Sequence, residues 1–289
     1  MQIKSFKDFL NEGGKVFKLE TRRVSATEAA DTINYLYKGL LKKLGLEEGK
    51  NIQAVGSGSI VISDKTDAGD IDFIYDLPDM RKRLGAESCE RRFFDRVRME
   101  LTDIKTEFIK GFGITSVEYP VAGEKDKGYV QVDFIPVENM DWSRFAYTQS
   151  SKSKYKSAHR NWLFSAMCSV KKTDVRKADG NILSWSSYMF DIQRGFFKVE
   201  KSLEGVNGNL IKNPKKVGSE LVTMDPDKFL SIMFDGSIHQ EQVESFEQCW
   251  KYVSIDEKWK DKIDELAKEL DKFLRRANLD IPNEIQEYL

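Results

Sequence analysis

The chain has 289 residues, enough for one large domain or two modest ones. It is 40% hydrophobic and 11% aromatic, a composition that indicates a globular protein with a hydrophobic core. The 46 basic and 47 acidic side chains nearly cancel, which argues against a strong overall field for nucleic acid or a membrane surface. No apolar run approaches the roughly 20 residues that span a bilayer. The start, MQIKSFKDFLNEGG, is too charged for a secretory signal peptide.

Cysteine and histidine are too scarce to suggest a thiol or imidazole metal site. Cys89, Cys168 and Cys249 lie far apart, which suits free thiols in a reducing compartment. The two histidines, His159 and His239, are too few for a histidine-rich zinc site. Any metal site in this chain is therefore expected to use oxygen ligands.

The first predicted elements are two helices. Residues 2–11 are amphipathic at helical spacing, as expected of a docking helix or a frayed terminus. A capping box formed by Ser25 and Glu28 predicts a second helix that runs to about Leu44. Arg22 and Arg23 stand just before this cap, either as a solvated pair or as a phosphate contact.

The most informative stretch is residues 55–75, VGSGSIVISDKTDAGDIDFIY. It opens with a turn of small residues, and residues 63–69 form a further loop. A strand is predicted from Asp70 to Tyr75, so Asp70 and Asp72 are expected side by side on one face. Two close carboxylates repel each other unless a cation lies between them. Oxygen-only ligands favour magnesium or manganese.

A later predicted strand, residues 129–137 (YVQVDFIPV), carries Asp133 among apolar neighbours. An acid in a strand is costly when it is buried alone, so one alternative is a salt-bridged or edge aspartate. The earlier strand already carries Asp70 and Asp72, and the helix between the two strands allows them to lie side by side. We therefore favour a metal site that the three aspartates share.

The segments around these strands are predicted as a mixture of helices and strands. The other elements expected before residue 150 are helices at 78–84 and 90–106, a strand at 114–119 and a hairpin loop at 121–128. Residues 150–170 are predicted as a helix with an apolar stripe. Its basic side, which includes Lys156 and Arg160, either solvates the helix or binds a triphosphate.

The character of the chain changes from Lys171. Residues 181–203 are rich in aromatic residues and are typical of β-hairpins, whereas residues 205–218 hold three glycines and a basic loop, KNPKK. A helix is predicted after Asp225-Pro226, and the end of the chain is predicted helical, with one helix at 255–277. No motif in this half indicates a substrate.

Taken together, the pattern resembles the DNA polymerase β-type nucleotidyltransferase superfamily. The motif of that superfamily is an apolar residue, Gly, Gly or Ser, about nine to thirteen residues, then two acids separated by an apolar residue in a strand. The residues that match this motif are Val55, Gly56, Ser57, Asp70, Ile71, Asp72 and Phe73. The strand that carries Asp133 looks like the third-carboxylate strand of the tRNA CCA-adding and poly(A) polymerase branches.

The resemblance implies an α+β nucleotidyltransferase fold, a small mixed sheet flanked by helices, followed by a C-terminal region of β-hairpins and helices. It implies an enzyme with two Mg²⁺ or Mn²⁺ ions and a nucleoside triphosphate, ATP included. Asp70, Asp72 and Asp133 would be the metal ligands and catalytic residues. The residues expected to bind the nucleotide are Gly56, Ser57, Gly58, Ser59, Lys156 and Arg160. The loop after Gly58 lacks the Ala-Arg-Gly of some minimal transferases.

A second set of segments, scattered over most of the chain, consists of GGKVFK, the Gly-Ser and Gly-Asp-Ile-Asp segments, KGYVQVDFIPV, YKSAHRN and DPDKFLSIMF. Together they resemble nucleotidyltransferase-fold proteins of tailed phages. Residues 1–13 are similar to the capsid-targeting segments that a prohead protease trims from phage proteins. This implies a phage protein in the host cytoplasm or packaged in the head as a virion protein, with a capsid or prohead association and no membrane partner. The domains expected are a targeting segment at 1–13, a catalytic domain at 14–170 and an accessory region at 171–289.

Three functions remain open from the sequence. The first is an active transferase whose acceptor is RNA, a protein or a small molecule. The second is a catalytically silent virion or interaction protein that keeps the fold, and the third is a signal-nucleotide synthase. Because Asp70, Asp72 and Asp133 are all present, the sequence favours an active site over a degenerate one.

Overall fold

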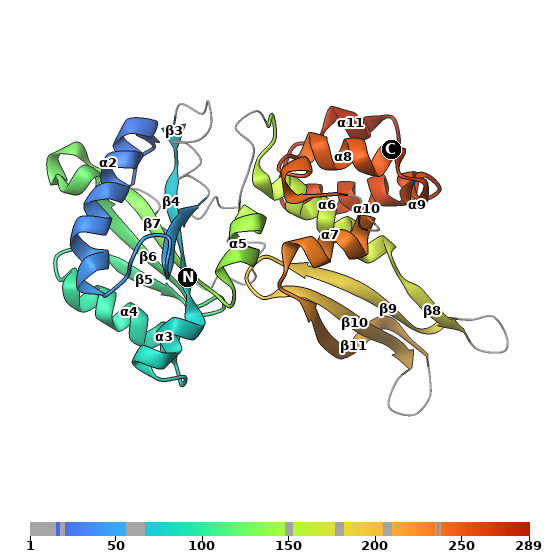
Figure 1. The fold of residues 1–289 in the computed structure, drawn as a ribbon, viewed down its shortest axis with the longest axis horizontal. Helices are drawn as coiled ribbons and strands as arrows, with labels where there is room; N and C mark the ends of the chain where they lie inside the picture. Colours follow the sequence, from blue (N-terminus) through green and yellow to red (C-terminus); the bar gives the residue numbers. More distant parts are fainter. Residues whose placement is uncertain are drawn as a thin grey trace. The chain divides into compact units, whose positions relative to one another are not determined.

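The structure is a computed structural model of the chain, and it contains helices and strands in two compact units, residues 1–152 and residues 153–289 (Figure 1). The residues that it describes are 16–17, 21–55, 67–147, 153–176, 182–204, 210–234, 236 and 238–289. The predicted α+β class is confirmed. The predicted segment at 1–13 and the small-residue turn at 56–59 lie outside the described residues.

The first unit is built on a five-stranded sheet with the strand order β2-β4-β7-β6-β5 (Figure 1). Strands β4 and β7 run parallel, and every other neighbouring pair is antiparallel, so the sheet is mixed. The strands are β2 (Ile52–Val55), β4 (Asp70–Asp76), β5 (Thr106–Ile109), β6 (Ile114–Pro120) and β7 (Tyr129–Val137). The predicted aspartate strands and the hairpin between β6 and β7 are confirmed.

The helices of this unit begin and end largely where local signals place them. The helices are α2 (Ala26–Leu36), its π-helical continuation η1 (Tyr37–Leu41), α3 (Leu77–Leu84), α4 (Cys89–Glu100) and α5 (Met140–Tyr147). The capping box is confirmed, because the Glu28 amide donates to Ser25 Oγ at 3.2 Å and the Ser25 amide donates to Glu28 Oε2 at 2.9 Å.

One predicted helix is too long. The expected helix at 90–106 ends at Glu100, and the chain then forms the edge strand β5 from Thr106. The pairing of β5 with β6, from Thr106 opposite Val117 to Ile109 opposite Ile114, outweighs the local helical pattern at the end of that segment. Helix α5 was not predicted.

The central strands carry different residues on their two faces. On one face, Ile71 and Phe73 of β4 lie opposite Val132 and Phe134 of β7, and all four are buried under helices α2 and α4 (Figure 1). The Phe73 and Phe134 rings stack with their centroids 5.6 Å apart. The other face carries the aspartates and a smaller apolar cluster, which consists of Val55, Ile74, Ile109, Ile114, Ile135, Val137 and Met140.

The hydroxyl of Tyr37 holds the edge strand β2 next to the site. It accepts a hydrogen bond from the Ala54 amide at 3.1 Å, one residue before β2 ends. We expect Tyr37→Phe to lower the free energy of unfolding by about 1 kcal/mol, because the partly buried Ala54 amide loses its acceptor. Urea unfolding measures this change in stability. Tyr35→Phe is the control, because Tyr35 is a half-exposed tyrosine. Equal stability of both variants would show that this bond contributes nothing.

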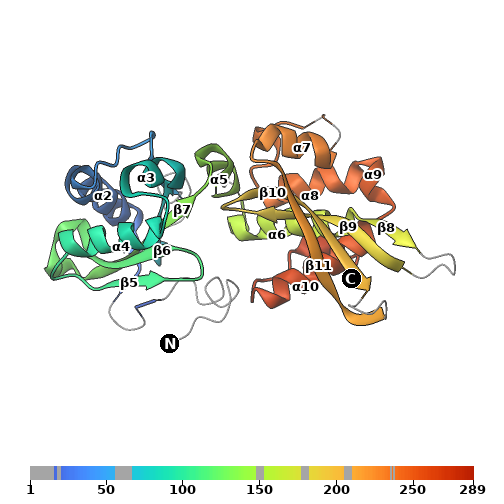
Figure 2. The same ribbon diagram turned by 90° about the horizontal axis from the view of Figure 1, so that it is seen from below.

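The second unit contains a four-stranded antiparallel sheet with the order β11-β10-β9-β8, drawn from below in Figure 2. The strands are β8 (Thr173–Arg176), β9 (Ile182–Asp191), β10 (Gly195–Glu204) and β11 (Leu210–Thr223). The predicted hairpins are confirmed, but KNPKK is not a loop, because it lies within β11. Strand β11 is at the edge of the sheet, where a proline is tolerated.

Helices pack against this sheet. The first of them, predicted as part of the catalytic domain, belongs to the second unit. The helices are α6 (Ser157–Val170), α7 (Pro226–Phe234), α8 (Phe246–Ile255), α9 (Glu257–Lys260), α10 (Ile263–Arg276) and α11 (Asn283–Gln286). Trp162 of α6 stacks on Phe273 of α10, and Phe164 contacts Phe190 of β9. These contacts place α6 in the second unit, so the division follows residue 152 and not residue 170.

The predicted helix at 255–277 is two helices. Asp256 has an extended backbone and its side chain accepts from the Lys258 amide at 2.8 Å, so it caps a new helix, α9. Helix α10 then begins at Ile263. Among the residues that the structure describes, no helix is both long and apolar enough to cross a membrane.

Candidate metal centre

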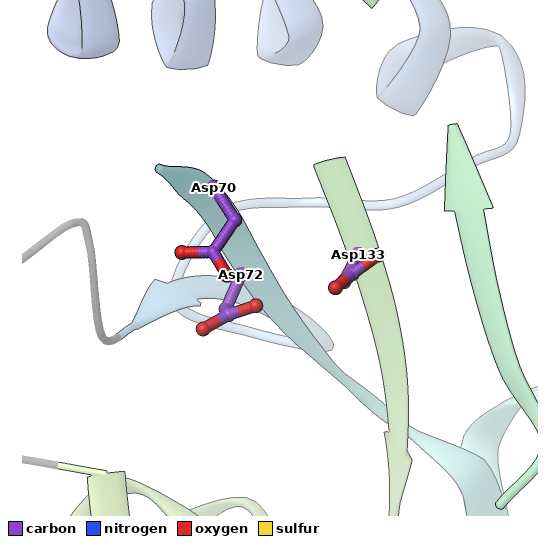
Figure 3. Close-up of side chains that lie close together, drawn as sticks. All are labelled: Asp70, Asp72 and Asp133. Carbon is purple, nitrogen blue, oxygen red and sulfur yellow. The ribbon is translucent and has the colours of Figure 1, made fainter. Parts of the chain in front are cut away.

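Three aspartates meet where the start of strand β4 lies beside the middle of strand β7. Asp72 lies directly opposite Asp133 in the parallel pair, and Asp70 lies two residues earlier on β4. One carboxylate oxygen of each lies within 4.8 Å of the others (Figure 3). Asp70 and Asp72 are half-buried, whereas Asp133 is only 1% exposed. The expected proximity of the three side chains is confirmed, and metal binding stays a prediction.

The register of the sheet surrounds the aspartates with buried polar side chains. Ser116 of β6 lies opposite Asp133, which continues the row from Asp72. Gln131 lies opposite Asp70 on one side and opposite Glu118 on the other. Ser116, Glu118 and Gln131 were not predicted as site residues. Their signal is the period of two in ITSVEYP and YVQVDFIPV, which becomes readable only once the register is known.

Burial raises the pKa of Asp133 to about 7, and the charge of Asp70 adds to the rise, while Ser116 and Gln131 oppose it. Burial, together with the charges of Asp70 and Asp133, also raises the pKa of Asp72 well above its usual range. Without a cation, this cluster favours protonated carboxyls. With a divalent cation between them, the carboxylates would be held in their ionised form.

The hydrogen bonds of Asp133 leave one oxygen for another ligand. Its Oδ2 accepts a hydrogen bond from Gln131 Nε2 at 2.8 Å, whereas its Oδ1 is buried without a hydrogen-bond partner. The Ser116 hydroxyl is close enough to lower the pKa of this carboxyl, but it has no hydrogen-bond partner of its own and does not occupy Oδ1. A buried carboxylate oxygen without a partner is costly. This orphaned oxygen and the all-oxygen donor set of Asp70, Asp72 and Asp133 fit Mg²⁺ or Mn²⁺.

The two arginines before the capping box have different roles. Arg22 pairs with Glu28 at 2.5 Å and donates from Nε to the Lys127 carbonyl at 2.9 Å, so it supports the local fold. Arg23 pairs with Asp67 at 2.7 Å, and the Asp67 hydrogen bond raises its pKa, with a smaller contribution from the charge of Asp70. Arg23 is therefore a cation at the edge of the aspartate cluster.

The two basic residues predicted to bind the nucleotide belong to the second unit. Lys156 is exposed and precedes α6. Arg160 is buried, and its Nη1 donates to the carbonyls of Val243 and Glu244 at 3.2 and 3.3 Å. Burial lowers the pKa of Arg160 to about 10. An Arg160 that bound phosphate would have to leave these contacts, so we leave it out of the proposed site.

We expect Arg160→Met to lower the free energy of unfolding of the second unit by about 2 kcal/mol, because buried carbonyls lose a charged donor. Lys156→Met serves as the control and should stay within about 0.5 kcal/mol of the wild type, since Lys156 is exposed. Urea unfolding followed by tryptophan fluorescence measures both. Unchanged stability of Arg160→Met with a raised KM for a triphosphate would return Arg160 to the site.

No protein-family model matches the chain, and no curated protein matches it. A function for this protein therefore has to be inferred from the residue pattern and from the geometry of the aspartate cluster.

Proposed function

We propose that the first unit is a metal-dependent nucleotidyltransferase with the fold of the DNA polymerase β type. It would transfer a nucleoside monophosphate from an NTP to a hydroxyl acceptor. The observation that carries the proposal is the placement of Asp72 opposite Asp133 on adjacent parallel strands, with Asp70 on the same face. Nucleotidyl transfer uses metal ions to neutralise the triphosphate and to activate the acceptor hydroxyl, and carboxylates in this arrangement could hold such ions.

The arrangement of the sheet supports the same proposal. Strand β2 ends at Val55, which lies opposite Asp72, and Gly56 and Ser57 follow Val55 in the sequence. We propose that the amides of this Gly-Ser pair and the Ser57 hydroxyl bind the β- and γ-phosphates. Arg23 would add positive charge at the edge of the cluster.

In the proposed reaction, the acceptor oxygen forms a bond to the α-phosphorus, the bond from that phosphorus to the bridging oxygen breaks, and pyrophosphate leaves. Asp70 and Asp72 would hold two Mg²⁺ or Mn²⁺ ions, and Asp133 would hold one of them. Bound ions would neutralise the triphosphate and lower the pKa of the acceptor hydroxyl. Asp133, when ionised, would accept the hydroxyl proton.

Transfer of label from each α-³²P-labelled NTP in the presence of Mg²⁺ tests the proposal, with RNA, protein extract or no added acceptor. Asp70→Asn should abolish the transfer, because it removes a ligand charge and keeps the side-chain volume. Asp103→Asn is the matched control, because Asp103 lies exposed in the turn after α4. Nucleotide binding without transfer to any acceptor would contradict the proposed reaction.

A further inference from the structure

We infer that Gln131 is a positioning residue for the metal centre, and that the N-terminal segment Val16–Phe17 fixes its orientation. The inference rests on the proposed metal centre and adds residues that are 115 positions apart in the chain. It makes the N-terminal segment a part of the site, although that segment contributes no metal ligand.

The Gln131 side chain is 2% exposed, and two of its hydrogen bonds bear on the orientation of its amide group. Its Nε2 donates to Asp133 Oδ2 at 2.8 Å, and its Oε1 accepts from the Val16 amide at 2.9 Å. Nε2 of an amide can only donate and Oε1 can only accept. Turning the amide over would place its oxygen against a carboxylate and its NH₂ group against an N–H. The Val16 amide therefore selects the orientation in which Gln131 donates to Asp133.

The N-terminal segment Val16–Phe17, which contacts the Gln131 side chain, has further contacts of its own that fix its position. Phe17 is 2% exposed, and the ammonium of Lys105 lies 5.4 Å from the centroid of its ring. The Phe17 carbonyl accepts from Thr21 Oγ1 at 3.2 Å. Val16 packs against the smaller apolar cluster on the aspartate face of the sheet. These contacts give the Val16 amide a fixed position from which it can orient Gln131.

A fixed Gln131 has a consequence for Asp133. Because Oδ2 is held by Gln131, the carboxylate plane is set and the orphaned Oδ1 remains for a cation. Side chains that orient metal ligands in this way typically change metal affinity by about 10- to 100-fold when they are lost. Removal of either hydrogen bond of Gln131 should thus weaken metal binding.

Calorimetric titration of the full chain with Mn²⁺ tests this inference. Gln131→Met keeps the volume of the side chain and removes both hydrogen bonds, and we expect it to weaken Mn²⁺ binding by about tenfold or more. Val16→Pro removes only the amide donor, and we expect a weakening of several-fold. Val16→Ala keeps the amide, and we expect affinity within about twofold of the wild type. Hydrogen exchange of the Val16 amide should be faster in Gln131→Met than in the wild type, with or without metal.

The outcomes separate this inference from the function that it builds on. Wild-type affinity in both Gln131→Met and Val16→Pro would overturn the positioning role and leave the transferase proposal intact. Absence of Mn²⁺ binding in the wild type would overturn both. If Val16→Pro does not fold, the inference is tested by the Mn²⁺ titration of Gln131→Met and by the exchange of the Val16 amide in that variant. Unchanged exchange in that variant would also overturn the inference.

Discussion

We expect Asp133→Asn to lower the rate of nucleotidyl transfer by at least ~10³-fold while it stabilises the metal-free protein at pH 8. The loss of activity follows from the removal of a charged metal ligand. The gain in stability, about 4 kcal/mol, follows because burial raises the pKa of Asp133 from 3.8 to about 7 and each pKa unit corresponds to about 1.4 kcal/mol, so at pH 8 the folded chain holds a disfavoured charge. An asparagine is neutral, has the same size and can still accept the hydrogen bond from Gln131.

Label transfer from an α-labelled NTP and urea unfolding in EDTA measure the two effects. Asp72→Asn should change both in the same direction, because burial and its two neighbouring carboxylates also raise its pKa. Asp103→Asn controls for a change of charge at an exposed position and should alter neither quantity. An Asp133→Asn variant that transfers at the wild-type rate would exclude Asp133 from the reaction. A variant less stable than the wild type at pH 8 would show that the charge is not disfavoured.

Activity and stability are expected to oppose each other at these aspartates, because the three carboxylates repel one another and a bound cation would relieve that repulsion. Asp70 and Asp72 lie in a strand whose other face carries the buried side chains of Ile71, Phe73 and Tyr75, and Asp133 is buried beside them. An apolar or amide residue at any of these positions would suit the fold better. Local choices that conflict with the fold are expected at functional sites. The cluster is therefore better explained by ligand binding than by folding.

The aspartate cluster was predictable because its signals are local. The period of two in DIDFIY and YVQVDFIPV places Asp70, Asp72 and Asp133 on strand faces, and the capping box of Ser25 and Glu28 is a four-residue pattern. Such patterns state what a side chain does relative to its own strand or helix. The pairing of β4 with β7 is the one further fact that brings the three aspartates together.

The remaining features depend on pairing between distant segments. Strand β5 follows a helical pattern and is a strand because β6 pairs with it. KNPKK resembles a loop and is a strand because β10 extends beside it. The contact between Val16 and Gln131 joins residues 115 apart, and the period of two that places Gln131 on the aspartate face does not indicate Val16 as its partner. The sequence carries such information only through register, which a single chain does not reveal.

The stability of the metal-free protein should fall as the pH rises from about 4 to about 7, to the extent that Asp133 controls it. Its folded pKa of about 7 is above the usual value of 3.8, so in this window the folded chain binds a proton that the unfolded chain has released. Raising the pH therefore favours unfolding, by up to about 1.4 kcal/mol per pH unit, and the effect levels off above pH 7.

Other carboxyls titrate in the same window, so the quantity to measure is the difference between the wild type and Asp133→Asn. The two should be nearly equal in stability at pH 4.5, and the variant should become the more stable one as the pH approaches 8. Because Mg²⁺ binds ionised carboxylates, its apparent affinity for the wild type should rise with pH up to about 7, with protons released on binding. Calorimetry in two buffers of different ionisation enthalpy measures that release. A stability difference that shrinks with rising pH, or metal binding without proton release at pH 6, would show that the carboxyl of Asp133 is already ionised in the metal-free fold.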